Sequence, residues 1–496
     1  MDKRPNSYIS RIITGTLSLG SLKVVGMMLG LLSTMVIARR VPTDAFGTFV
    51  LLAVVVSFLA QVSSLGLDLS IVRFIAGTED EARKHDLLST AILLRLLAIV
   101  VCSLVAWMGR PWLLKLFSAP MLSDLMIFMP LLFLLESFQT LLRSILQGYF
   151  RFTRIGITDF MNSFLNLLLL LIMISFLQVG VVELILARSM AVAVASVFAY
   201  FSIPVRKKFV FRPDIIKEVV RFGFPLQLND ILHFIFTRID TIVIGALLGS
   251  VDIAFYEFAR KIPDSLSQLF QPFRSVYFSF SSKLYALDDQ NKVARLLNDS
   301  ARLVSFVTIF GAALALLFGK DIILLVFSAK YLPSVPLFAL LMINLCGSLV
   351  GNVLGTTLVT VGESNKPVIV NLFNMAGSVL ACVLLTPAWG VTGAAIGTTI
   401  GTFAVFPAMM VFLRRKIDAK VMPYLKPMVI FCAWAALVLL LKPASFLAKS
   451  GSIGVFLLAC VLLSVVTEND LKLLLVGSGV TSWAPIRKFF PRGGWL

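Results

Sequence analysis

The sequence predicts an all-α protein that crosses a membrane many times. Of its 496 residues, 58% are hydrophobic and only 14% are charged, and the mean hydropathy is +0.95. A single soluble core cannot bury that much apolar surface in a chain of this length. The apolar residues also recur in runs of about 20, the length that a membrane-spanning helix requires. Most of this chain is therefore expected to lie in the lipid bilayer.

The apolar runs predict fourteen membrane spans. They lie at residues 13–38, 45–67, 87–108, 122–147, 157–178, 181–204, 219–248, 252–280, 298–318, 333–360, 367–386, 392–413, 424–442 and 451–467. A basic tail, MDKRPNSYISR, precedes the first run, and no small-residue cleavage site follows a short apolar stretch. We therefore interpret the first run as a retained helix and not as a signal peptide.

The basic residues orient these spans. A net charge of +18 could indicate nucleic-acid binding, but most of the 44 Lys and Arg residues fall in alternate gaps between the spans. Cytoplasmic loops are enriched in Lys and Arg in this way. The pattern predicts a protein of the cytoplasmic membrane with both termini in the cytoplasm, and it gives no reason to expect nucleic acid as a partner.

An internal repeat divides the chain. When the first six spans are slid onto the next six, VIARRVPTDAFGTF (36–49) lies over VIGALLGSVDIAFYEF (243–258). Three polar residues of the fifth span match residues of the eleventh at a constant offset: Asp159 with Asn371, Asn162 with Asn374 and Asn166 with Ser378. Six helices per half place both halves in the membrane in the same sense, as in parallel-repeat transporters. We predict six-helix lobes at 1–208 and 209–416, with two additional spans and a cytoplasmic tail in 417–496.

The sequence shows no constellation of catalytic residues. His85 and His233 lie far apart, and the five cysteines sit inside apolar runs without the paired spacing of a metal site or a disulfide framework. The glycines lack the strand-turn-helix context of a nucleotide fingerprint. We therefore expect no enzymatic activity, no metal and no cofactor. Energy for transport would come from an H⁺ or Na⁺ gradient or from the membrane potential.

Polar residues inside the spans are the candidate functional residues, because a charge in a membrane is costly and commonly faces a water-filled cavity or a partner. In the eighth span they recur every three or four residues, so one face of that helix is expected to be polar. We expect these residues to line a lumen between the two lobes. The candidates for substrate binding are Lys23, Gln61, Arg143, Arg238, Arg260, Lys261 and Arg274, and those for ion coupling or salt bridges are Glu136, Asp230, His233, Asp240, Glu257 and Asp264.

The charge balance in the spans favours an anionic cargo. Basic residues, with Arg95 and Arg188 included, outnumber the acids there. Guanidinium groups bind phosphate in a bidentate manner, which would suit a diphosphate headgroup.

A static salt bridge is the alternative role for many of these candidates. Antiparallel packing of the seventh and eighth spans would place Asp240 opposite Arg260 and Arg238 near Asp264. Glu136 and Arg143 share a helix face and could form a similar pair. Lys23 has no acidic neighbour in its own hairpin, which favours a functional role, whereas His233 is more simply a hydrogen-bonded packing residue than a proton relay.

Four stretches of sequence carry a family resemblance. They are DAFGTFVLLAVVVSFLAQVSSLGLDLSIVRFIA (44–76), RIDTIVIGALLGSVDIAFYEFARKI (238–262), LVFSAKYLPSVPLFALL (325–341) and GESNKPVIVNLFNMAGSVLACVLLTPAWGVTGAAIGTTIG (362–401). In this order they resemble the polysaccharide-biosynthesis branch of the superfamily that also holds the MATE multidrug exporters and the lipid II flippases. The order of the four stretches and the fourteen predicted spans carry the resemblance together.

The resemblance implies a fold and a function. The fold would be a V-shaped bundle of two lobes that alternates access, and the cargo an undecaprenyl-diphosphate-linked oligosaccharide, flipped to the outer leaflet for O-antigen, capsule or exopolysaccharide synthesis. Arg238, Asp240, Glu257 and Arg260 would lie on the walls of a cationic lumen. A polysaccharide polymerase and glycosyltransferases would be the protein partners.

Three other functions remain open at this point. The first span lacks the run of arginines found in lipid II flippases, since Lys23 stands there alone, so lipid II is the less expected cargo. A MATE-like antiporter for organic cations is disfavoured by the fourteen spans and the basic lumen. A non-transporting scaffold for polysaccharide enzymes would leave the charges inside the spans unexplained.

Overall fold

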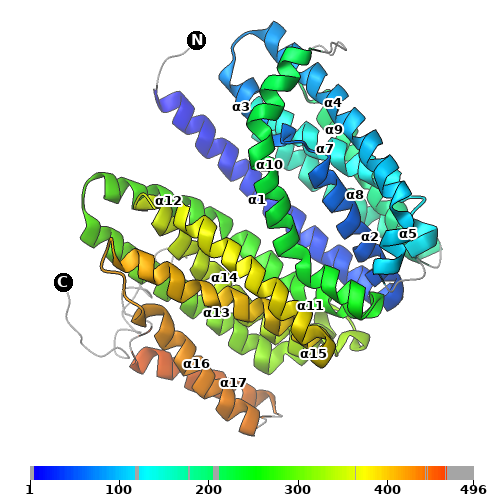
Figure 1. Cartoon of the computed structure of the whole chain (residues 1–496). Coiled ribbons are helices and arrows are strands. Elements are labelled where there is room, and N and C mark those ends of the chain that lie inside the picture. Colours follow the sequence, from blue (N-terminus) through cyan, green and yellow to red (C-terminus); the bar gives the residue numbers. More distant parts are fainter. Residues whose placement is uncertain are drawn as a thin grey trace. The chain divides into compact units, whose positions relative to one another are not determined.

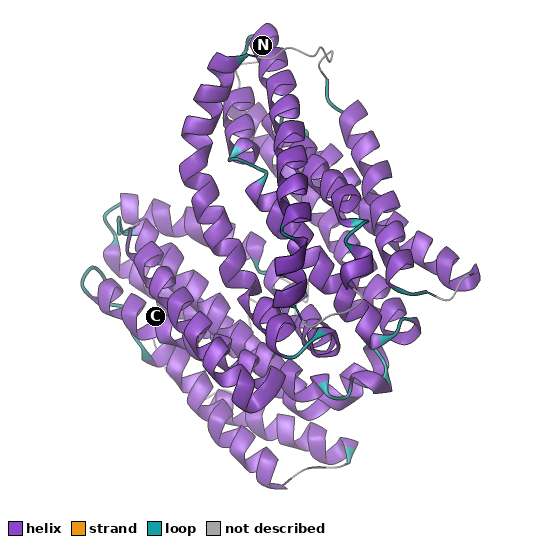
Figure 2. Ribbon diagram, turned by 45° about the vertical axis from the view of Figure 1, so that its right-hand side comes forward, coloured by secondary structure: helices purple, strands orange, loops and turns teal. Residues whose placement is uncertain are grey.

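The computed structural model describes residues 5–117, 122–176, 179–204, 212–363, 365–441, 443, 445–463 and 465, without the side chains of residues 5–20, 116, 226, 229, 275 and 423. Every regular element in this part of the chain is a helix (Figure 2), which confirms the predicted all-α class. The chain forms two compact units, unit 1 (Met1–Glu257) and unit 2 (Phe258–Leu496). The predicted cytoplasmic tail and the basic segment after the sixth span lie outside the described residues.

Unit 1 contains ten helices and the beginning of an eleventh within its described residues (Figure 1). They are α1 (Pro5–Arg40), α2 (Thr43–Val62), α3 (Leu67–Gly77), α4 (Glu81–Met108), α5 (Arg110–Leu116), α6 (Leu122–Leu125), α7 (Met129–Gly148), α8 (Phe152–Phe176), α9 (Val181–Phe201), α10 (Pro213–Leu247) and the first part of α11 (Ser250–Leu269). Helix α1 packs against α8, while α7 contacts α2, α3, α4 and α9. Helix α7 is therefore the centre of the bundle.

Small side chains allow the helices of unit 1 to pack closely. Ala187, Ala191, Ala195 and Ala199 are fully buried and recur every four residues along α9. Such a stripe of small residues brings helix backbones together in a membrane, where apolar burial alone gives no driving force. The backbone polar groups are satisfied inside each helix, as lipid requires.

A break between α2 and α3 receives α10. Leu65 and Gly66 have positive φ angles of 49° and 75°. The span predicted at 45–67 therefore corresponds to α2 and the break, and α3 is a separate helix beyond it. The backbone N–H of Gly66 donates to Oε1 of Gln227 at 3.0 Å, and the Ser70 hydroxyl donates to the carbonyl of Val219 at 3.0 Å. A Cβ on Gly66 would lie 2.2 Å from the carbonyl carbon of Gly223. Only glycine fits this crossing of α10 over the break.

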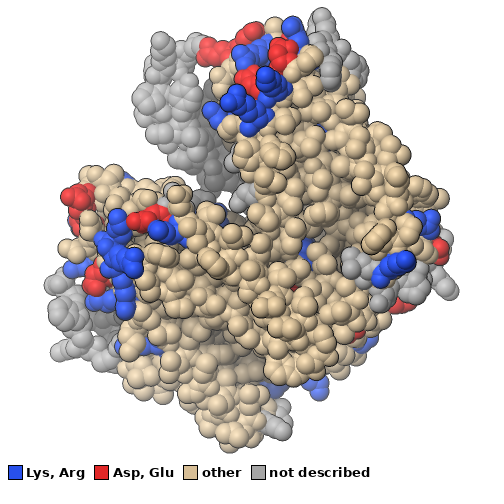
Figure 3. Space-filling view, viewed as in Figure 1, with Lys and Arg blue, Asp and Glu red and all other residues tan. Residues whose placement is uncertain are grey.

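Ion pairs gather at one end of unit 1. The Arg83 and Glu218 side chains are 3.0 Å apart, and those of Arg212 and Asp86 are 3.1 Å apart. On the face that Figure 3 shows, charged side chains cluster where α3 ends and where α4 and α10 begin, while the helix bodies carry few charges. This distribution is the one expected of helices whose middle parts lie in lipid.

Unit 2 contains the rest of α11 and the helices that follow it. These are α12 (Gln271–Ala286), α13 (Gln290–Val326), the 3₁₀ helix η1 (Ala329–Tyr331), α14 (Ser334–Thr360), α15 (Asn365–Arg414), α16 (Met422–Leu441) and α17 (Phe446–Leu462). Helix α13 packs against α12, α14, α16 and α17. The buried ring of Phe258 lies 4.0 Å from the ring of Tyr331 and 5.0 Å from that of Phe327, measured between centroids. These rings anchor η1 to α11.

Helix α15 is a hairpin and not a rod. Gly390 has φ 60° and ψ −143°, which are not helical values. A Cβ on Gly393 would lie 2.1 Å from the carbonyl oxygen of Leu385, and one on Gly397 would lie 2.6 Å from the backbone nitrogen of Cys382. The two arms therefore run side by side, and they correspond to the predicted spans 367–386 and 392–413.

The described residues contain 10 helices that are long and apolar enough to cross a membrane. Helix α15 counts once among them although it has two arms. Helices α10 and α11 fall outside this set because of their charged residues, and α17 because it is short. The protein is a multi-pass membrane protein; the count of fourteen spans and the lobes predicted at 1–208, 209–416 and 417–496 stay predictions.

Candidate functional site

Arg143 of α7 pairs with Asp159 of α8, and Lys23 lies on α1, the helix that packs against α8. The Arg143 Nη2 atom lies 2.8 Å from Oδ2 of Asp159, and the two side chains are 49% and 29% exposed. Lys23 of α1 is the second cation that acts electrostatically on the Asp159 carboxylate. We call these three residues the cationic cluster. One carboxylate balances only one of the two cations, so the cluster carries a surplus positive charge.

Asp159 is the residue of this cluster that sequence reasoning missed as a site residue. The sequence indicates it only as one of the residues that match within the repeat. The signal available in the sequence was its place inside a span, where an acid needs a cation. The expectation that Lys23 lacks an acid was correct for its own hairpin, but α8 supplies one because it packs against α1.

Glu136 does not pair with Arg143. Its Oε1 atom lies 3.1 Å from Nε of Arg188, which joins α7 to α9. The expected pair within α7 is therefore wrong. Residues seven apart on one helix share a face but are separated by about 10 Å of helix rise, so each charge finds a partner on a neighbouring helix.

Arg95 is buried and does not contribute to a cationic surface. Its side chain is 0% exposed and lies 3.8 Å from Oδ2 of Asp68. Its Nε and Nη2 groups donate to the Ser137 carbonyl at 3.3 and 3.2 Å. In the sequence, Arg95 is one of the basic residues whose excess over acids predicts an anionic cargo. In the structure, its contacts instead tie α3, α4 and α7 together.

Within unit 1, contacts of the hairpin of α10 and α11 involve three of the predicted residues, Arg238, Asp240 and Glu257. Arg238 lies 3.1 Å from Glu257, whose Oε1 atom also accepts a hydrogen bond from the Thr241 hydroxyl at 3.1 Å. Asp240 is buried and accepts hydrogen bonds from the Tyr256 hydroxyl and from the backbone N–H of Thr241. These contacts stabilise the hairpin and leave Arg238 about one-third exposed.

The remaining candidates are more scattered. In unit 2, Arg260 lies 2.9 Å from Asp264 one turn later on the same helix. The side chain of His233 is exposed, those of Asp230 and Lys261 are half-buried, and that of Arg274 is exposed. The Gln61 carbonyl accepts a hydrogen bond from the Gln227 side chain. The pairs expected between Asp240 and Arg260 and between Arg238 and Asp264 would join the two units, and they stay predictions, as does the lumen role of every candidate.

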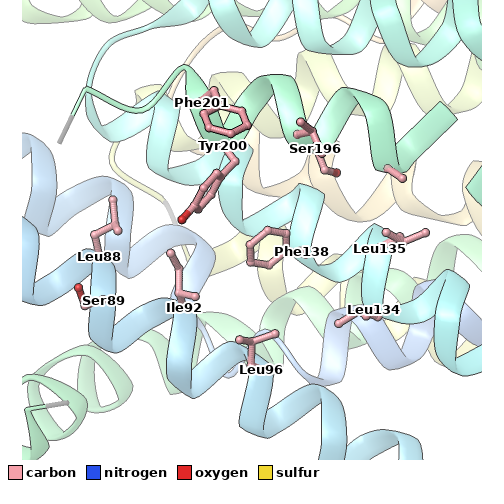
Figure 4. Close-up of a pocket in the computed structure, with 12 residues that line it drawn as sticks. Leu88, Ser89, Ile92, Leu96, Leu134, Leu135, Phe138, Ser196, Tyr200 and Phe201 are labelled. Atoms are coloured by element: carbon pink, nitrogen blue, oxygen red, sulfur yellow. The ribbon is translucent and has the colours of Figure 1, made fainter. Parts of the chain in front are cut away.

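An apolar cavity of about 450 Å³ lies among α4, α7 and α9 (Figure 4). The rings of Phe138 and Tyr200 point into it, and Leu88, Ile92 and Leu134 form other parts of its wall. The cavity lacks the charges that would bind an anion. Among the described residues, no group of three or more His, Cys, Asp and Glu side chains is placed to hold a metal ion.

The fold defines the class of this protein. It is similar to the lipid II flippase MurJ in an inward closed conformation, with a TM-score of 0.71 and 15% identity over 88% of this chain and 97% of that one. It is also similar to an inward-facing MATE family transporter of the MOP superfamily, with a TM-score of 0.62 and 20% identity over 82% and 94% of the two chains. These similarities show a multi-helix membrane fold shared with the transporters of that superfamily.

The sequence then identifies the family. The family described as "Polysaccharide biosynthesis protein" matches residues 36–336, more than half of the chain. The chain belongs to this family, which confirms the resemblance predicted from the four stretches. It is 25% identical to an uncharacterized membrane protein in the cps region of Klebsiella pneumoniae, over 77% of this chain and 78% of that protein. It is 24% identical to the capsular polysaccharide biosynthesis protein CapF of Staphylococcus aureus, over 40% of this chain and 50% of that protein.

Proposed function

We propose that this protein flips a lipid-linked, diphosphate-bearing oligosaccharide from the cytoplasmic to the outer leaflet, for the synthesis of capsule, O-antigen or exopolysaccharide. The observation that carries the proposal is the cationic cluster of Lys23, Arg143 and Asp159, found in a chain of the polysaccharide biosynthesis family. A surplus cation inside membrane spans is costly unless an anion is bound there for part of the cycle.

The geometry of the cluster suits a phosphate. Asp159 holds the Arg143 guanidinium at 2.8 Å, yet half of the arginine side chain stays exposed. The remaining N–H groups of the guanidinium can donate two parallel hydrogen bonds to phosphate oxygens. Lys23 adds a second, flexible donor from another helix. Asp159 thus orients the arginine while the substrate supplies the missing negative charge.

Transport would follow from alternating access of the two lobes, with both termini in the cytoplasm. An H⁺ or Na⁺ gradient or the membrane potential would supply the energy, since we expect no cofactor. The undecaprenyl chain would stay in the bilayer while the polar headgroup crosses. A polymerase and glycosyltransferases would act on the products and precursors of this step.

An antiporter for organic cations and a lipid II flippase are the alternatives. A cationic cluster repels an organic cation, which disfavours the first. The first span has Lys23 where lipid II flippases carry several arginines, which disfavours the second.

Reconstitution of the full chain in liposomes tests the proposal. Undecaprenyl-diphosphate oligosaccharide placed in the liposomes should become accessible from the other leaflet faster than in protein-free liposomes. Lipid II and ethidium, a model cation cargo, serve as competing substrates in parallel assays. Movement of ethidium without movement of the oligosaccharide lipid would refute the proposed function and support the antiporter.

A further inference from the structure

A polar cavity of about 770 Å³ lies between the first turn of α13 and the segment 415–421 that joins α15 to α16. Four cationic side chains line it, those of Arg414, Arg415, Lys416 and Lys420, together with a single acid, Asp418. This cavity belongs to unit 2 and is separate in sequence from the cationic cluster of α1, α7 and α8.

The joining segment is held in a defined shape. The side-chain amide of Asn298 on α13 donates to the Asp418 carbonyl at 3.4 Å, and its carbonyl oxygen accepts from the backbone N–H of Lys420 at 3.0 Å. The Arg414 Nε group donates to the Ala419 carbonyl at 3.3 Å. These contacts fix the backbone of the segment and the Arg414 side chain at the cavity.

The four cations outnumber the two acids near them, Asp418 and Glu363, so the cavity keeps a net positive charge. Lys416 lies 3.3 Å from Glu363. In the described part of the chain, Arg414, Arg415 and Lys420 form no ion pair, and Arg415 instead lies 5.9 Å from the centroid of the Phe412 ring. Charges of one sign gathered around a cavity attract a counter-ion, and phosphate offers several acceptor oxygens to such a group.

An apolar stripe begins at the rim of this cavity. Helix α16 starts at Met422, and Met422, Leu425 and Val429 are 61%, 40% and 64% exposed. Their spacing of three and four residues places them on one face of the helix. Acyl chains of the bilayer cover such a face, so a phosphate headgroup held in the cavity has an apolar surface beside it for its own acyl chains.

We propose that the cavity binds the phosphate headgroup of an anionic membrane phospholipid, with the acyl chains lying along the exposed face of α16. Charge complementarity and the adjoining apolar stripe together favour this occupant. The site does not depend on the proposed transport function, and it would tie the connection between α15 and α16 to the membrane surface.

Native mass spectrometry of the full chain tests the site by titration with phosphatidylglycerol. The triple variant Arg414→Gln, Arg415→Gln and Lys420→Gln should bind it on the order of 100-fold more weakly, roughly fivefold for each charge removed. A control variant, Arg151→Gln with Arg154→Gln and Lys217→Gln, removes the same charge from exposed positions of unit 1 and should bind like the wild type. If the triple variant does not fold, Lys420→Gln alone should still show about a fivefold loss.

Three outcomes would overturn the proposal. An equal loss in the control variant would mean that the lipid responds to overall charge only. Binding of phosphatidylcholine with the same acyl chains at equal affinity would show that the net negative charge is irrelevant. A rise in Tm with inorganic phosphate as large as that with phosphatidylglycerol would identify a site for soluble anions.

Discussion

Two groups of charged residues in the helices of unit 1 differ in how their charges are balanced. Arg95 and Asp68 form a balanced pair whose arginine is fully buried and donates to the Ser137 carbonyl. Arg143, Asp159 and Lys23 form a cluster with an extra cation, and half of the Arg143 side chain is exposed. In the first group the two charges balance each other, and in the second one cation is left over.

The difference teaches that the number of charges in the spans is a poor guide to a binding site. By sequence, Arg95 and Arg143 both look like cationic residues of membrane helices. A charge whose partners are all in the protein holds helices together, whereas an exposed surplus can recognise a substrate. The variants below separate these two roles, in order of expected effect.

The largest effect is expected from Arg95→Met. The change leaves the Ser137 carbonyl without its donor and the partly buried Asp68 carboxylate without its cation, which costs up to about 3–5 kcal/mol of the free energy of unfolding. Thermal melting of the purified protein in detergent would report it as a strong drop in Tm. The double variant Arg95→Met with Asp68→Asn should recover most of the loss, and a wild-type Tm for Arg95→Met alone would show that the pair is not structural.

The second-largest loss of stability is expected from Gly66→Ala. Gly66 has φ 75°, and a Cβ there would lie 2.2 Å from the Gly223 backbone. Strain and the displaced α10 together cost more than about 2 kcal/mol. Gly77→Ala is the matched control, because a Cβ at Gly77 meets nothing within 4 Å. Equal Tm values for the two variants would mean that α10 does not depend on the break between α2 and α3.

Lys23→Gln and Arg143→Gln should reduce transport and spare the fold. Loss of a charge-assisted hydrogen bond, worth ~1.5–3 kcal/mol, corresponds to a roughly tenfold to hundredfold lower rate of oligosaccharide-lipid flipping in liposomes. Arg143→Lys should keep part of the activity because the charge remains without the planar donor pair. Full flipping activity in both glutamine variants would show that the cationic cluster takes no part in transport.

The smallest effect is expected from the double variant Glu136→Gln with Arg188→Gln. These residues form a balanced, partly exposed pair between α7 and α9, and such pairs contribute about 1 kcal/mol or less. Flipping should stay at the wild-type rate in the same liposome assay. A loss comparable to that of Arg143→Gln would place this pair in the substrate path as well.

The sequence was informative about single helices and less so about pairs of residues. Hydropathy located α9 and α14 within a few residues because burial in lipid acts on each helix separately. It did not predict the break at Gly66, since a left-handed turn inside an apolar run leaves no hydropathic signal. The sequence also does not predict the pairing of Glu136 with Arg188, because this pair depends on which face of α9 packs against α7.

The sequence by itself determined that this chain is a helical membrane protein of a polysaccharide biosynthesis family, because composition, apolar run length and motif order are local properties. Only the tertiary structure decided which charges are balanced. Arg95, Arg143 and Arg188 are alike in sequence, and each finds its acid on another helix, at Asp68, Asp159 and Glu136. The reason is that the hydropathy of each segment alone determines whether it forms a membrane helix, whereas the partner of a charged residue depends on how the helices pack together.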